Sequence, residues 1–130
     1  MDRSRLNAIS MLMETKVTAG QARLATALRR EKRLLDMLSE LDTLLTQTEG
    51  AKHAGSVAII EFQNDVQVRR WVDQCRSSIN SELAQVRALI AIERESLSKE
   101  FGRATALDLL AKNHERSGRK LAERKRSYES

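Results

Sequence analysis

Residues 6–45 read LNAISMLMETKVTAGQARLATALRREKRLLDMLSELDTLL, and this stretch decides the fold. Apolar side chains recur in it on two interleaved series, each with a seven-residue spacing. One series is Leu6, Met13, Gly20, Ala27, Leu34 and Leu41, and the other is Ser10, Val17, Leu24, Glu31, Leu38 and Leu45. Two series of this spacing, sustained over several heptads, are typical of the seam of a coiled coil. The stretch therefore predicts one long helix with an apolar seam.

Three positions interrupt this seam, namely Ser10, Gly20 and Glu31. A long, shallow interface tolerates polar or small residues, which is the simpler explanation for all three. The alternative is that polar seam residues fix the register and the choice of partner at some cost in stability.

The helical periodicity lapses at residues 47–56, which read QTEGAKHAGS and contain two glycines. We expect Gly50 to end the first helix in the left-handed conformation, and Ser56 to cap the second helix by accepting a backbone N–H bond. The expected elements are a helix over residues 4–47, a turn over 48–56 and a helix over 57–127.

The second helix carries its own seam, which Glu93 and His114 interrupt and which thins after Ala111. Its expected members are Val68, Val72, Cys75, Ile79, Leu83, Val86, Ile90, Leu97, Phe101, Ala104, Leu107, Ala111 and Leu121. Most neighbouring members are three or four residues apart, which is the period of a helix face.

The composition agrees with two long helices. The chain has 130 residues, 32% of them charged and only 3% aromatic, and it contains no proline, which would break a helix interior. We predict an all-α fold: a single domain that forms a long, antiparallel, two-helix coiled-coil hairpin.

Antiparallel pairing about the expected turn places Leu24 near Leu83 and Leu6 near Phe101. The second helix then outruns the first. The segment after about Gly102 is expected to be a C-terminal helical overhang without an intramolecular partner.

The formal net charge of +5 favours an acidic partner of some kind. A lone cysteine, Cys75, cannot form an internal disulfide, so we expect the protein to reside in a reducing compartment. No apolar run is long enough for a signal peptide or a membrane span. We therefore expect a cytoplasmic protein that is peripheral to a membrane at most.

No constellation of residues in the sequence supports catalysis. His53 and His114 are the only histidines, and neither lies beside a nucleophile or at metal-ligand spacing. We expect no enzyme activity, no catalytic or metal-binding residue, no cofactor and no small-molecule substrate.

Two groups of residues are candidates for binding a protein partner. The first is one helix face at spacings of four, three and four, formed by Trp71, Cys75, Ser78 and Glu82. Tryptophan often anchors interfaces, although flanking the seam and covering it would give Trp71 the same spacing. Cys75 falls in the seam, where a small buried hydrophobe is the simpler role. The second group lies in the C-terminal arm and comprises Leu107, Leu110, Leu121, Arg116, Arg119, Lys120 and Arg124.

Two stretches, WVDQCRSSINSELAQV at residues 71–86 and FGRATALDLLAKNHERSGRKLAERKR at 101–126, resemble the FliJ/YscO family of flagellar and virulence type III export proteins. The resemblance implies a coiled-coil stalk that inserts into the export ATPase ring and contacts the cytoplasmic domain of the export gate. It implies Trp71, Cys75, Ser78 and Glu82 as the gate face. Cys75, Ser78 and Glu82 depart from the residue types that the family pattern has there.

The expected function is therefore that of a non-enzymatic stalk coupling the export ATPase ring to the export gate, with export chaperones as further candidate partners. A generic coiled-coil adaptor or homo-oligomerising scaffold is the alternative. A basic helical nucleic-acid binder is the weaker one, because acidic residues are interspersed among the basic ones and no nucleic-acid-binding motif accompanies them.

Overall fold

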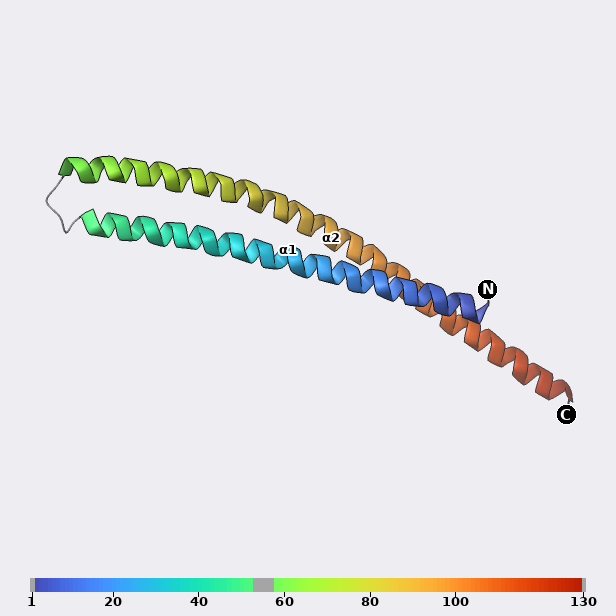
Figure 1. Cartoon of the computed structure of the whole chain (residues 1–130). Helices are drawn as coiled ribbons and strands as arrows, with labels where there is room; N and C mark the ends of the chain where they lie inside the picture. Colours follow the sequence, from blue (N-terminus) through green and yellow to red (C-terminus); the bar gives the residue numbers. More distant parts are fainter. Residues whose placement is uncertain (1, 53–57, 130) are drawn as a thin grey trace. The chain divides into compact units, whose positions relative to one another are not determined.

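The computed structural model describes residues 2–52 and 58–129, with the side chains of 49–52 and 58–63 left aside. The fold is all-α, as predicted: an antiparallel hairpin of two long helices, α1 (Arg3–Lys52) and α2 (Ala58–Glu129), with no strand in the described ranges (Figure 1). Contacts divide the chain into two units, residues 1–24 with 92–130 and residues 25–91, so each unit is built from both helices.

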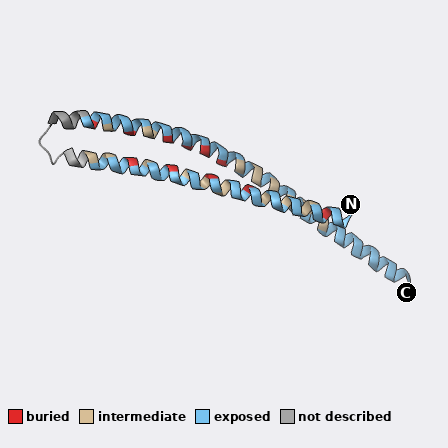
Figure 2. Ribbon diagram, viewed as in Figure 1, coloured by how far each residue is buried: buried red, intermediate tan, exposed pale blue. Residues whose placement is uncertain are grey.

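The unit of residues 25–91 has the denser apolar core. Its buried apolar side chains are Ala27, Leu34 and Leu41 from α1 and Val72, Ile79, Leu83, Val86 and Ile90 from α2 (Figure 2). In α1, the series through Leu34 is buried, and the series through Leu38 is half-buried. The seven-residue pattern therefore placed the seam of α1 correctly.

The unit formed by residues 1–24 and 92–130 is more thinly packed. Leu6 and Gly20 of α1 are buried in this unit, whereas the residues of α2 that face them are only half-buried. The half-buried apolar residues of α2 here are Leu97, Ala104, Leu107 and Ala111. At the start of α1, Asp2 caps the helix, because its Oδ1 accepts a hydrogen bond from the backbone N–H of Ser4 at 3.5 Å.

The register of the two helices differs from the sequence-based expectation. Arg23 lies beside Glu93, with Nε 3.2 Å from Oε2, and Arg30 lies beside Glu82. Leu24 follows Arg23, which contacts Glu93, and Leu83 follows Glu82, which contacts Arg30. Leu24 and Leu83 are therefore not opposite each other. The sequence-based pairing assumed a turn centred near residue 52. The observed pairs Arg23–Glu93 and Arg3–Glu115 instead place each residue of α1 opposite a residue farther along α2 than expected.

Near the N-terminus, the same shift moves the start of the overhang. Arg3 Nη2 lies 3.8 Å from Glu115 Oε1, and Leu6 is buried while its expected neighbour Phe101 is 46% exposed. The expectation that the segment after Gly102 is unpaired is wrong. The overhang begins after about Glu115, where Arg3 at the start of α1 makes its contact.

Phe101 is also not a seam residue. Glu100 takes that position, half-buried, because a step of three residues from Leu97 keeps the seam line as well as a step of four does. His114 and Leu121 are exposed. The predicted seam therefore ends at Ala111.

The first helix ends later than expected. It continues through Gly50 to Lys52, so Gly50 does not end it in a left-handed conformation. The second helix extends to Glu129. The expected cap at Ser56 and the histidine at His53 lie outside the described residues. The single-domain organisation stays a prediction.

Candidate interaction surfaces

The first candidate surface lies on one side of the unit of residues 25–91. Trp71, Ser78 and Glu82 are exposed there and Cys75 is half-buried, which places the four at the edge of the seam as their spacing predicts. Glu82 is not free, since its Oε2 lies 3.7 Å from Arg30 Nη2 on α1. This contact identifies which side of α1 adjoins the surface.

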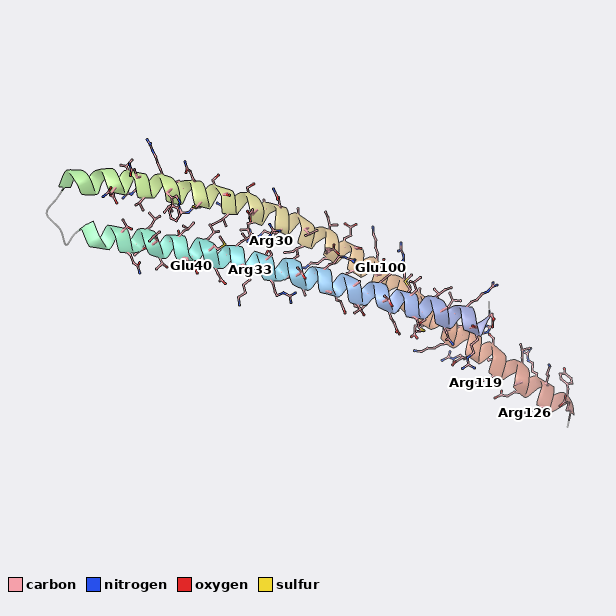
Figure 3. The ribbon with its side chains drawn as sticks, in the orientation of Figure 1. Arg30, Arg33, Glu40, Glu100, Arg119 and Arg126 are labelled. Atoms are coloured by element: carbon pink, nitrogen blue, oxygen red, sulfur yellow. The ribbon has the colours of Figure 1, made fainter. Side chains whose placement is uncertain are left out.

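Residues of α1 complete this side, and the sequence analysis missed them. Arg30, Met37 and Leu44 recur at intervals of seven, so they share one flank of the seam. A hollow lined by Arg30, Arg33, Leu34, Met37 and Glu82 joins the two helices there. Side chains of Arg30 and Arg33 stand out from this part of the chain in Figure 3.

We call the residues Trp71, Ser78, Glu82, Arg30, Arg33, Met37 and Leu44 the tryptophan side. Trp71 is 52% exposed, Met37 47% and Leu44 38%. Tryptophan, methionine and arginine are the residue types that are enriched in protein interfaces. The heptad interval from Arg30 to Leu44 could have revealed the contribution of α1, but only the Arg30–Glu82 contact shows which flank faces Trp71.

On the opposite side of the same unit, ion pairs join the two helices. Arg76 pairs with Asp42, and Arg87 Nε lies 3.3 Å from Glu31 Oε2. Glu31, which interrupts the seam in the sequence, is thus bound by an arginine of the facing helix. Exposed pairs of this kind contribute about 0–1 kcal/mol each, so they favour one register more than they stabilise the fold.

The second candidate surface is the C-terminal end of α2. Every residue from Lys112 to Glu129 is exposed, and we call residues 116–129 the arm. Arg119 and Arg126 extend from it in Figure 3. The predicted site residues Arg116, Arg119, Lys120, Leu121 and Arg124 all belong to the arm.

The two leucines predicted with the arm lie before it and differ in their surroundings. Leu107 is half-buried in the seam against α1, and Leu110 is 58% exposed. Leu107 is therefore part of the hairpin core and not of a free surface. Leu110 lies one row outside the seam line and is open to solvent.

The described residues form no cluster of metal-ligand side chains. Within residues 2–52 and 58–129, no group of three or more His, Cys, Asp or Glu residues could hold a metal ion. Cys75 is a free, half-buried thiol at the seam edge. Of the helices described, none has the length and apolar character that crossing a membrane requires.

Comparison with protein-family models, with curated proteins and with solved structures finds no match to this chain.

Proposed function

We propose that this chain is a non-enzymatic coiled-coil stalk of a protein export apparatus of the flagellar or virulence type III kind. In this role its C-terminal arm docks into an export ATPase ring, and its tryptophan side meets the cytoplasmic domain of the export gate. The proposal starts from the resemblance of residues 71–86 and 101–126 to the FliJ/YscO family.

The observation that carries the proposal is the inequality of the two helices. Beyond Glu115, α2 continues past the start of α1, where Arg3 lines a hollow with Gly118, Arg119 and Ala122, and every described residue of that arm is exposed. The arm contains six basic residues, Arg116, Arg119, Lys120, Arg124, Lys125 and Arg126, against Glu123 and Glu129. An exposed, basic helix end suits entry into an acidic opening, and charge of this kind speeds docking.

Helical pairing also suits a stalk. The paired helices carry two separate surfaces, one for each partner. The tryptophan side belongs to one unit and the arm to the other, so each surface can be altered without touching the other.

The experiment is a chain that ends at Glu115, assayed for stimulation of the cognate export ATPase. It keeps every buried residue, so we expect unchanged helicity by circular dichroism and loss of stimulation. Full stimulation by the shortened chain contradicts the proposal. A matched control is Trp71→Ala, which we expect to stimulate the ATPase normally and to bind the gate domain less tightly.

The alternative role, a homo-oligomerising scaffold, is favoured by one observation. Met11 and Leu12 are largely exposed on α1, beside a hollow lined by Met11, Glu14, Thr15, Thr18, Ala19 and Ala22. Analytical ultracentrifugation separates the two roles. A monomer at micromolar concentration supports the stalk, and a dimer that Met11→Glu dissociates supports the scaffold.

A further inference from the structure

The last turns of α2 carry a second stripe that is not the seam. Residues Arg103, Ala106, Leu110, Asn113, Ser117, Leu121, Arg124 and Tyr128 follow one another at spacings of three and four along the continuous helix. They therefore lie on one face, which we call the outer stripe. Leu110 and Tyr128 are separated by about five helical turns, or roughly 27 Å.

Large apolar side chains of the outer stripe are open to solvent. Leu110 is 58% exposed, Leu121 60% and Tyr128 90%. The seam residues Ala104, Leu107 and Ala111, one position away, are half-buried against α1. The stripe is thus accessible while the hairpin is intact, and it runs from the paired part of α2 onto the arm.

Charges are segregated around this part of the helix. The outer stripe and its immediate neighbour Lys125 include three basic residues, of which Arg103 is paired, because its Nη1 lies 3.6 Å from Glu100 Oε1. The acidic residues between Arg103 and Tyr128 are Asp108, Glu115 and Glu123. They fall on the other half of the helix, where Asp108 pairs with Lys112 at 3.2 Å. Among the described residues, no ion pair joins Arg124 or Lys125 to a carboxylate.

We infer that the outer stripe binds an acidic amphipathic helix of another protein, which lies along α2 with its aliphatic residues against Leu110, Leu121 and Tyr128. Arg124 and Lys125, which no described carboxylate pairs with, match a partner face that carries Asp or Glu beside its aliphatic residues. The inference rests on the proposed function in taking the arm as a docking end, and it assigns the partner's chemistry and the face used.

Other occupants fit the stripe less well. A second copy of the arm carries the same positive charge, so arm-to-arm pairing brings like charges together. Phosphates offer leucine side chains nothing apolar to contact, and base edges offer them little beyond the thymine methyl group, which disfavours nucleic acid. A bilayer surface favours a helix with a large continuous apolar face, whereas Leu110 and Leu121 are about 16 Å apart with only polar residues of the stripe between them.

The test measures binding of the full-length chain to a synthetic, labelled helical peptide that has Leu at a and d positions and Glu at e and g, by fluorescence anisotropy. We compare the double variant Arg124→Glu/Lys125→Glu and the variant Leu121→Ser with the control Lys112→Glu/Arg126→Glu. The control makes the same change in net charge on the other half of the helix. Circular dichroism confirms that all variants stay helical.

We expect the on-stripe variants to raise the Kd by about tenfold or more and the control by about twofold or less, because only the stripe side chains lose direct contacts. Equal weakening by both double variants would show non-specific attraction and overturn the inference, as would the absence of peptide binding. Tighter binding to anionic vesicles or to RNA than to the peptide would also overturn it. So would self-association of the chain that the on-stripe variants abolish.

The peptide experiment needs no export ATPase, so its failure is separate from failure of the proposed function. Stripe-specific peptide binding by a chain that does not stimulate the ATPase supports the inference and contradicts the export role. Normal stimulation by Arg124→Glu/Lys125→Glu overturns the inference and leaves the export role standing.

Discussion

Leu97 of α2 packs directly onto Gly20 of α1. A Cβ atom built on Gly20 would lie 3.1 Å from Leu97 Cδ1, closer than ordinary van der Waals contact. Gly20 therefore lets the two helices approach where the seam in this unit is thin. Beside it, Arg23 donates a hydrogen bond from Nε to Oε2 of Glu93, whose side chain is only 15% exposed. These two contacts set the register of the hairpin at this point.

Substitution of Gly20 tests the close contact. We expect Gly20→Ala to change the free energy of unfolding by less than about 1 kcal/mol, because the gain in helix propensity is offset by crowding of Leu97. Gly20→Leu should destabilise by about 1–3 kcal/mol through overpacking. Gly102 is the matched control: no atom lies within 4 Å of a Cβ built there, so Gly102→Ala should stabilise by about 1 kcal/mol. Urea unfolding followed by circular dichroism measures all three, and stabilisation by Gly20→Leu would contradict the contact.

Disulfide cross-linking tests the register. In a chain with Cys75→Ser, the pair Gly20→Cys and Leu97→Cys should form a disulfide on oxidation, because the two positions are in contact. The pair Leu6→Cys and Phe101→Cys, which the sequence-based pairing brings together, should not. Gel mobility under non-reducing conditions reads out both pairs. A cross-link in the second pair but not in the first would restore the register expected from the sequence.

A charge in the core should be far more damaging than a charge change at the surface. Ile79 is buried, so Ile79→Asp places an unpaired carboxylate in an apolar seam and should cost several kcal/mol, on the order of 3 or more. Lys120→Glu changes an exposed arm residue and should alter the melting temperature little. Thermal melts with equal shifts for both variants would show that Ile79 is not in the seam.

Trp71 distinguishes partner binding from packing. Its exposed position predicts that Trp71→Ala lowers the free energy of unfolding by less than about 1 kcal/mol while weakening binding of a gate fragment by about tenfold or more. Met37→Ala should weaken the same binding, because Met37 lies on the same side of the unit. Leu35→Ala is the control, since Leu35 lies seven residues before Asp42 on the opposite side. Calorimetric titration and thermal melts measure the two effects, and a large loss of stability with unchanged affinity would assign Trp71 to packing alone.

The sequence by itself determined the two helices and the seam of α1. The series through Leu34 and Leu41 is buried because a seven-residue repeat keeps the same face of a helix turned toward its neighbour, whatever that neighbour is. The periodicity left open whether Trp71 covers the seam and counted Leu121 as a seam residue, whereas both are exposed.

Only the tertiary structure decided which residues of the two helices meet. A heptad pattern repeats along the helix, so sliding one helix past the other by a heptad still brings apolar residues together, and the pattern alone cannot select a register. The selection depends on particular contacts between distant residues, such as Gly20 with Leu97 and Arg3 with Glu115. The same contacts fix where the overhang begins and leave Phe101 outside the seam, and the contact between Arg30 and Glu82 decides which flank of α1 accompanies Trp71.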